Sequence, residues 1–249
     1  MRISHASSTN FSAVACTPLR SFPDGYRALV IGASGGIGQA FVRQLQADQR
    51  FAKVVALCRS STPSVDFDQE SSVASAARML HGTGPFHLII NAAGLLHSGR
   101  GMPEKRLSEL NYAQLEHTFR ANTFGPALVL AHFTPLLAAE RAVLACLSAK
   151  VGSIADNRLG GWYGYRASKA ALNMLVKTAA IEVARKQPKA VLVALHPGTV
   201  NTPLSAPFRG ADIGRAADAA AADMLAVLDR LHSADSGGFF SYTGESLPW

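Results

Sequence analysis

The chain has 249 residues, of which 48% are hydrophobic and 16% charged, a composition typical of a packed globular domain rather than a disordered chain. Its net charge of +7 comes from scattered basic residues without a helix-turn-helix, zinc-finger or RNA-binding aromatic pattern, so no nucleic acid partner is expected. The most apolar stretch, residues 124–139, is interrupted by Pro126, His132 and Pro135, so no membrane association is expected.

The first 25 residues differ from the rest of the chain. Residues 1–25 are rich in serine, weakly periodic, and contain one acidic residue, Asp24. They lack the continuous apolar core of a secretory signal, while Arg2 and Arg20 among the serines leave organelle targeting open. We therefore expect a flexible N-terminal extension at 1–25, followed by a single domain at 26–249.

Cysteine and histidine usage bears on compartment and on metals. Cys16, Cys58 and Cys146 are odd in number and form no C-x-x-C pair, which favours a reducing cytoplasm. The eight histidines form no H-E-x-x-H motif and no cluster with cysteine, so no metal site is expected.

From residue 26 onward, short apolar runs alternate with longer amphipathic ones, a pattern typical of β-α units around a parallel sheet. The predicted strands lie at 28–32, 54–58, 64–67, 87–92, 142–147, 190–195 and 238–242. One predicted helix follows the first strand, and the others lie at 73–80, 112–137, 163–185 and 216–231, the second of these kinked at Pro126. The predicted fold class is α/β: a Rossmann-type doubly wound parallel sheet in a single domain.

A glycine-rich turn follows the first predicted strand. Its sequence, Gly32-Ala-Ser-Gly35-Gly36-Ile37-Gly38, places four glycines in seven residues before a helix. Such a turn lets the backbone approach a pyrophosphate, which the helix N-terminus then binds. The spacing differs from G-x-G-x-x-G, and a plain tight turn is the alternative, but a plain turn uses only one or two glycines. No G-x-x-x-x-G-K-[ST] motif is present, which disfavours a nucleotide triphosphatase.

Arg59 ends the second predicted strand, 21 residues after Gly38. In dinucleotide-binding folds an acid near this place binds the ribose hydroxyls, whereas an arginine accommodates a 2′-phosphate. The local sequence is Cys58-Arg-Ser-Ser61, without an acid, so NADP(H) is expected as cofactor, with NAD(H) as the less favoured choice. The alternative is a solvent-facing arginine at a strand end.

Tyr165 and Lys169 are four residues apart on the predicted helix 163–185. Side chains at this spacing share one helix face, and a nearby ammonium lowers the pKa of a phenol. A phenol tuned in this way exchanges a proton with a carbonyl or alcohol oxygen. The pair alone is a weak signal, because helix surfaces produce it by chance.

Taken with the glycine turn, these motifs resemble the short-chain dehydrogenase/reductase family over residues 26–249, in the C-factor-like branch near the sniffer-type carbonyl reductases. The branch is indicated by the stretches Gly160–Asn173 and Gly237–Trp249. The resemblance implies hydride transfer between NADP(H) and a small carbonyl or alcohol substrate, in a homodimer or homotetramer. Tyr165 would be the acid/base, with Lys169 lowering its pKa and also binding the nicotinamide ribose.

The resemblance also implies roles for residues at the strand ends. Asp66 would contact the adenine amine, Phe67 would supply backbone contact, and Asn122 would support a water relay to Lys169. Each of the polar residues has a structural alternative, such as capping a strand or helix. The full set of expected cofactor-binding residues is Gly32, Ser34, Gly36, Ile37, Gly38, Arg59, Asp66, Phe67, Asn91, Ala92, Ala93, Gly94, Tyr165, Lys169, Pro197, Val200 and Thr202.

One position departs from the family. The catalytic serine of the family falls at residue 149, where this chain has Ala149. Ser148 and Ser153 are the candidate replacements, and a third alternative is that no serine acts. Losing one such hydrogen bond costs roughly 10²–10³ in rate.

The segment 203–215 is short where the family has its substrate loop. An apolar pocket for a small or aromatic carbonyl compound is expected, bordered by Leu95, His97, Trp162, Leu204 and Phe208. The rival function is a dinucleotide-binding signalling or regulatory protein with little catalysis, which Ala149 favours and the Tyr165/Lys169 pair opposes. A methyltransferase accounts for the glycines but leaves that pair without a role.

Overall fold

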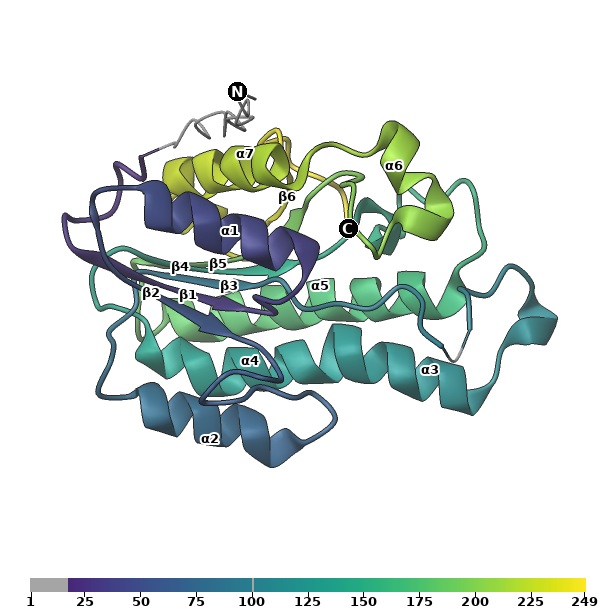
Figure 1. Cartoon of the computed structure of the whole chain (residues 1–249), viewed down its shortest axis with the longest axis horizontal. Coiled ribbons are helices and arrows are strands. Elements are labelled where there is room, and N and C mark those ends of the chain that lie inside the picture. The colour runs from purple at the N-terminus through teal and green to yellow at the C-terminus, as the bar shows by residue number, and fades with distance from the viewer. Residues whose placement is uncertain (1–17, 100) are drawn as a thin grey trace, which may run out of the picture.

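The computed structural model describes residues 18–99 and 101–249. In these residues, six parallel strands form one sheet in the order β2-β1-β3-β4-β5-β6 (Figure 1). The order reverses between β1 and β3, so the carboxyl ends of these strands open a crevice of the kind in which α/β proteins bind ligands. The predicted Rossmann-type sheet in a single domain is confirmed. The strands are β1 Tyr26–Ile31, β2 Phe51–Leu57, β3 Leu88–Asn91, β4 Ala142–Leu147, β5 Ala190–His196 and β6 Phe239–Ser241.

Helices cover both faces of the sheet, as Figure 1 shows. On one face α1 packs against α7, and on the other α4 lies between α2 and α5. The α-helices are α1 Gly36–Ala47, α2 Glu70–Leu80, α3 Tyr112–Phe119, α4 Gly125–Phe133, α5 Tyr163–Ala184, α6 Gly210–Ile213 and α7 Ala217–Arg230. Short 3₁₀ turns occupy Leu107–Glu109, Thr134–Leu136, Lys150–Gly152, Ala206–Phe208 and Ser233–Asp235.

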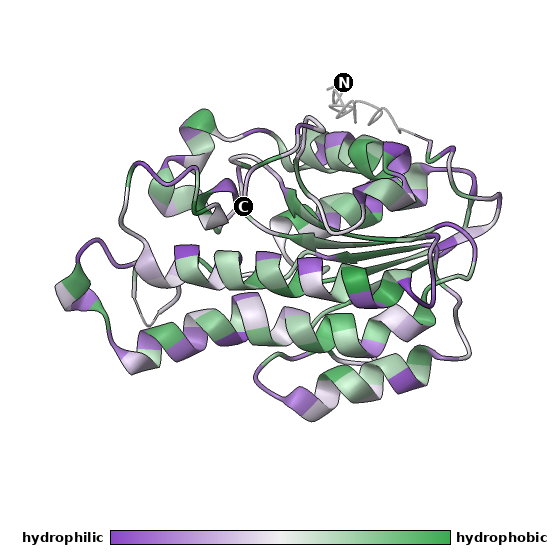
Figure 2. Ribbon diagram, turned by 180° about the vertical axis from the view of Figure 1, so that it is seen from behind, coloured by the Kyte–Doolittle hydropathy of each residue, from purple (hydrophilic) through white to green (hydrophobic). Residues whose placement is uncertain are grey.

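The central strands are apolar throughout because helices bury both of their faces. All six residues of β4 are buried, with Val143 in the cluster that contains residues of α1 and α7, and Leu144 in the cluster that contains residues of α2, α4 and α5. Figure 2 shows this hydrophobic character along the strands, while the helices mix hydrophobic and hydrophilic residues. The sheet is therefore a rigid platform whose carboxyl edge carries the loops discussed below.

The predicted strand at 64–67 is wrong. The N–H of Val65 donates to the carbonyl of Cys58, and the N–H of Asp66 donates to the hydroxyl of Ser72, which in turn donates to the Asp66 carbonyl. These backbone groups are satisfied within the loop, and β2 remains the edge of the sheet. The alternation of polar and apolar residues over 64–67 is a weak signal in four residues, and the local side-chain hydrogen bonds outweigh it.

The helix predicted over 112–137 is interrupted, as expected near Pro126, but by a change of helix type. A π-helical segment, Arg120–Phe124, separates α3 from α4, and the N–H of Gly125 donates to the carbonyl of Arg120 five residues earlier. Pro126 then occupies the first turn of α4, and because it has no N–H it cannot donate to a carbonyl of the preceding π-helical segment. The segment contains Asn122, and such π segments occur often at functional sites.

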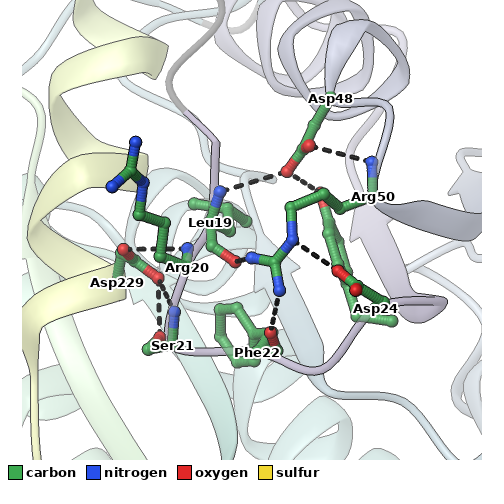
Figure 3. A network of polar contacts seen from close by, with 9 residues as sticks. Leu19, Arg20, Ser21, Phe22, Asp24, Asp48, Arg50 and Asp229 are labelled. Atoms are coloured by element: carbon green, nitrogen blue, oxygen red, sulfur yellow. Dashed lines mark hydrogen bonds and ion pairs between the residues drawn. The ribbon is translucent and has the colours of Figure 1, made fainter.

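Residues 18–25, placed in the extension by their sequence, pack onto the domain (Figure 3). Leu19 and Phe22 are each only 1% exposed. The N–H and hydroxyl of Ser21 donate to Asp229 of α7, and the guanidinium of Arg50 bonds Asp24 and the carbonyls of Leu19 and Phe22. The boundary predicted at residue 25 therefore does not coincide with the edge of the packed domain, and residues 1–17, with Cys16, lie outside the described residues.

Two absences hold for the part of the chain that the structure describes. None of its helices has both the length and the apolar character needed to cross a bilayer. It also brings no three His, Cys, Asp or Glu side chains into a group suited to a metal ion.

Candidate active site

The glycine turn joins the carboxyl end of β1 to α1 and presses against the end of β3. Gly32 has φ +78°, and a Cβ there would lie 2.5 Å from the backbone nitrogen of Ala93. A side chain is therefore excluded at Gly32 by both conformation and space. The turn aims the N-terminus of α1, with its unpaired N–H groups and positive dipole end, at the crevice.

A cleft of about 270 Å³ opens beside this turn, at the switch point of the sheet. It is formed by the ends of β1, β2 and β3 and by the π-helical segment with the end of α3. Among the expected cofactor-binding residues it gathers Gly32, Ser34, Arg59, Asp66, Phe67, Ala92, Ala93 and Gly94. Leu95, expected at the substrate pocket, also lines the cleft. The other lining residues were not among the expected cofactor-binding residues: Ile31, Gly35, Cys58, Val65, Asp68, His117 and Ala121.

The loop after β2 contributes the basic and acidic groups of the cleft. Arg59 is exposed at its rim, and no described carboxylate forms an ion pair with its guanidinium. Asp68 pairs with Arg120 at 3.8 Å. The Cys58 thiol lies 3.3 Å from the Ser60 hydroxyl, and this hydrogen bond lowers the pKa of Cys58. Arg59 is thus the unneutralised cation at this end of the cleft.

Asp66 and Phe67 enter the cleft in different ways. The carboxylate of Asp66 accepts the N–H of Asp68 at 3.0 Å, which fixes the loop. The ring of Phe67 lies against Gly125, where a Cβ would come within 2.2 Å of it. The ring therefore packs on the start of α4, and Phe67 also lines the cleft.

Several expected cofactor-binding residues do not line the cleft but support the turns that form its walls. Asn91 is 1% exposed, and its Oδ1 accepts the N–H of Ala93, so it holds the turn after β3. Gly38 is packed under the glycine turn, because a Cβ added to it would lie 2.1 Å from the carbonyl oxygen of Gly32. Ile37 packs against the core.

The segment that follows β5 reaches the start of α1. A Cβ added to Gly36 would lie 2.7 Å from the methyl group of Thr202, so the two are in contact. Val200 is buried and pairs with Arg215 in a short bridge, while Pro197 is half-buried at the end of β5. This segment and the glycine turn therefore form two walls of one crevice.

Tyr165 and Lys169 occupy the first two turns of α5, and the Lys169 ammonium lies 5.8 Å from the centre of the Tyr165 ring. Lys169 is 3% exposed, and its Nζ donates to the carbonyl of Leu147 at 2.9 Å. Burial lowers the pKa of Lys169 to about 8 and raises the pKa of Tyr165 to about 12. The expected lowering of the Tyr165 pKa by Lys169 is therefore not found. Desolvation of the phenolate governs this pKa, and the Lys169 ammonium is hydrogen-bonded to the carbonyl of Leu147.

Asn122 lies in the π-helical segment and is fully buried. Its Oδ1 accepts the N–H of Leu95 at 2.8 Å, and its Nδ2 donates to the Leu95 carbonyl and to the Ser168 hydroxyl. A Cβ on Gly94 would lie 3.4 Å from this Oδ1 and 3.5 Å from the Lys169 Nζ. Asn122 thus joins the loop after β3 to α5 beside Lys169, and both polar atoms of its side chain are engaged in these hydrogen bonds.

The hydroxyls of the two candidate serines also form hydrogen bonds within the protein. Ser148, 4% exposed, donates its hydroxyl hydrogen to Oδ1 of Asn173 at 2.6 Å. Ser153, 1% exposed, donates to the carbonyl of Trp249 and accepts the N–H of Asp156. Ala149 lies between them at the end of β4, with an extended backbone of φ −149° and ψ 144°. Both hydroxyls therefore already form hydrogen bonds within the protein, and a replacement for the family serine stays a prediction.

Aromatic side chains gather around Tyr165. The Trp162 ring lies edge-on to Phe208 at 4.9 Å and to Tyr165 at 6.2 Å, and Phe208 also contacts His97 at 5.9 Å. His97 reaches the carbonyls of Pro203 and Leu204 through Nε2, a bond that requires the hydrogen on Nε2. The loops after β3 and β5 therefore meet close to Tyr165.

A family model for short chain dehydrogenases matches residues 26–212. The C-signal protein of Myxococcus xanthus is 39% identical over 170 residues, covering 67% of this chain and 95% of that protein. The carbonyl reductase Sniffer of D. melanogaster has the same fold, with a TM-score of 0.79 at 22% identity over 92% of this chain and all of that one. An NADPH-bound carbonyl reductase from chicken fatty liver gives a TM-score of 0.78 at 26% identity, with the same coverage.

Proposed function

The chain belongs to the short-chain dehydrogenase family, and from this membership we propose that it is an NADP(H)-dependent oxidoreductase that reduces a carbonyl compound to an alcohol. The C-factor-like and sniffer-type resemblance is confirmed by the relatives described above. The observation that carries the proposal is the Tyr165/Lys169 pair at the crevice where the glycine turn and the loops after β3 and β5 converge.

Tyr165 acts as the proton donor. With a pKa of about 12 it holds its proton at neutral pH, so it is ready to protonate the oxygen of a carbonyl substrate. Lys169, with a pKa of about 8, is mostly cationic at pH 7 and stabilises the phenolate that forms when the proton leaves. The protonated phenol is the form that carbonyl reduction requires, whereas alcohol oxidation requires the phenolate.

The crevice fits a dinucleotide on its own geometry. The glycine turn, the loop after β2 and the loop after β3 line the cleft, and these are the segments that would bind the adenosine part of a dinucleotide. Thr202 contacts Gly36 at the start of α1, where the pyrophosphate would bind. When bound, the nicotinamide supplies the hydride. Arg59 at the rim offers an unpaired guanidinium for a 2′-phosphate, which supports NADP(H) over NAD(H).

The substrate pocket is formed by Leu95, His97, Trp162, Leu204 and Phe208 around Tyr165. Their aromatic contacts support a small or aromatic carbonyl compound as substrate. Assembly into a homodimer or homotetramer is proposed through α4 and α5. A groove of about 590 Å³ lies between these helices. Met174 and Ile181, which lie on α5 outside the lining of this groove, are exposed at 66% and 53%.

A second candidate is a dinucleotide-binding signalling protein with little catalysis. The resemblance to the C-signal protein and the alanine at position 149 favour it. The pairing of Tyr165 with the buried Lys169 opposes it, because a protein that only binds a dinucleotide has no need of an acid/base phenol beside this ammonium.

The two candidates are separated by NADPH oxidation. Wild type and Tyr165→Phe are tested against a panel of aldehydes, ketones and quinones, while NADPH binding is measured by fluorescence. The proposal requires turnover by the wild type that falls by at least about 10² in the variant, with NADPH affinity unchanged. Tight NADPH binding by the wild type, without turnover of any compound in the panel, supports the signalling protein instead.

A further inference from the structure

Glu104 is a buried carboxylate that the proposed chemistry does not use. It lies in the loop between β3 and α3 and is only 2% exposed. Its Oε2 accepts the N–H of Gly164 at 3.0 Å, and its backbone carbonyl accepts the N–H of Trp162 at 2.5 Å. Among the residues that the structure describes, none forms a hydrogen bond with its Oε1. Burying a carboxylate is unfavourable, so its position at the start of α5 calls for a compensating role.

The start of α5 needs an external partner. Trp162 is its N-cap residue, with left-handed backbone angles of φ 53° and ψ 44° and no side-chain hydrogen bond to the first turn. A bulky residue in this conformation is strained and persists only where its surroundings hold it. Glu104 grips the backbone N–H groups on both sides of Tyr163, and its negative charge lies at the positive end of a 22-residue helix.

The residues held in this way lead directly to the site. Gly164 immediately precedes Tyr165, and the indole of Trp162 contacts both Tyr165 and Phe208. Gly164 also has no side chain to displace the carboxylate, since a Cβ there would lie 2.9 Å from Oε1. The fit between Glu104 and Gly164 therefore sets where the phenol and the indole lie.

We propose that Glu104 is a positioning residue, whose carboxylate clamps the first turn of α5 and thereby places Tyr165 and Trp162 for carbonyl reduction. The positioning role rests on the proposed function, but the contact between Glu104 and α5 can be measured in the absence of substrate. Misplacing a catalytic group by a fraction of an ångström costs about tenfold or more in rate. The glutamine variant keeps an oxygen for the Gly164 N–H, whereas the alanine variant does not.

The substrate-free readout is fluorescence. The chain has two tryptophans, so in a Trp249→Phe background Trp162 is the sole emitter. We expect Glu104→Ala to increase acrylamide quenching of Trp162 at least about twofold, because an unclamped turn releases the indole. In Glu104→Gln, acrylamide should quench the Trp162 fluorescence to the same extent as in the parent protein. Equal quenching in parent and Glu104→Ala overturns the clamp, whatever the enzyme's activity.

The kinetic readout separates positioning from mere stability. At a temperature where all variants are folded, we expect Glu104→Ala to lower kcat about tenfold or more and Glu104→Gln to stay within about threefold of wild type. NADPH affinity should be unchanged in both. A Glu104→Ala enzyme that only unfolds at a lower temperature, with wild-type kcat and KM, overturns the proposal. If the wild type reduces no carbonyl, the proposed function fails while the quenching result still decides the clamp.

Gly164→Ala tests the same contact from the other side. Alanine is the better helix residue, so α5 should not lose stability through helix propensity, yet its methyl group must displace Oε1. A lower kcat with increased quenching is expected. Glu116→Gln is the matched control, because it removes the same charge from an exposed position on α3 and should leave kcat and quenching at parent values. A Gly164→Ala variant with parent kcat and quenching contradicts the proposal.

Discussion

The hydroxyl of Ser148 donates to Oδ1 of Asn173 across 2.6 Å, joining the end of β4 to the middle of α5. One residue earlier, the carbonyl of Leu147 accepts a hydrogen bond from Lys169 of the same helix. Helix α5 thus holds the strand end at two consecutive residues, and within the described residues Nδ2 of Asn173 has no hydrogen-bond partner. Ser148 serves this junction, which leaves the position of the family serine to Ala149.

Ser148→Ala should therefore behave as a structural variant. It leaves Oδ1 of Asn173 buried without a donor, so unfolding free energy should fall by about 1–3 kcal/mol. The rate constant kcat should change by less than about fivefold, far below the loss of roughly 10²–10³ expected for a catalytic serine. Urea unfolding and steady-state kinetics measure the two effects. A loss of 10² in kcat with unchanged stability would instead make Ser148 the missing hydrogen-bond donor.

Ala149→Ser should gain activity. The extended backbone at 149 accepts serine without strain, and the added hydroxyl supplies a second hydrogen bond to the substrate carbonyl oxygen. We expect kcat to rise by about tenfold or more, because such donors act mainly on the transition state. Ala149→Val is the control, since it fills the same place without a donor. No increase in kcat would mean that another group already occupies this role.

Arg59→Asp should reverse the cofactor preference. The aspartate repels a 2′-phosphate and offers a carboxylate to free ribose hydroxyls, so the ratio of kcat/KM for NADPH to that for NADH should fall by about 10². Lys189→Asp makes the same charge change at an exposed residue just before the amino end of β5 and serves as the control. A ratio that stays at the wild-type value rules out the 2′-phosphate contact.

Lys169→Met should stabilise the fold while removing activity. In the folded state the Lys169 pKa is about 8, below its ordinary value of 10.5, so at pH 7 the folded chain bears the full cost of the buried charge. Removing the charge should raise the unfolding free energy by about 1–3 kcal/mol at pH 7.

The sign of the pH dependence follows from the same pKa. Between pH 8 and 10.5 the unfolded chain holds a proton that folded Lys169 has released, so the wild type gains stability relative to the variant as pH rises. Urea unfolding of both proteins at pH 7 and pH 10 measures the gap, which should shrink. A gap of equal size at both pH values contradicts the assigned Lys169 pKa.

The sequence predicted the α/β class, the Gly32–Gly38 turn and the helix that carries Tyr165 and Lys169. Each of these follows from local chemistry: glycine spacing, apolar periodicity and an i, i+4 pair are visible within a short stretch of chain. The strand predicted at 64–67 failed, because four residues of β propensity are a weak signal beside the local hydrogen bonds of Ser72.

The sequence by itself therefore determined which residue types this protein brings to its crevice and in what order along the chain. Only the tertiary structure decided what those residues do there. Asn173 draws Ser148 away from the crevice, burial rather than Lys169 governs the Tyr165 pKa, and Glu104 caps a helix that begins some 60 residues later. The reason is physical: solvation and long-range hydrogen bonds depend on which atoms surround a group, and those atoms come from segments that are distant in sequence.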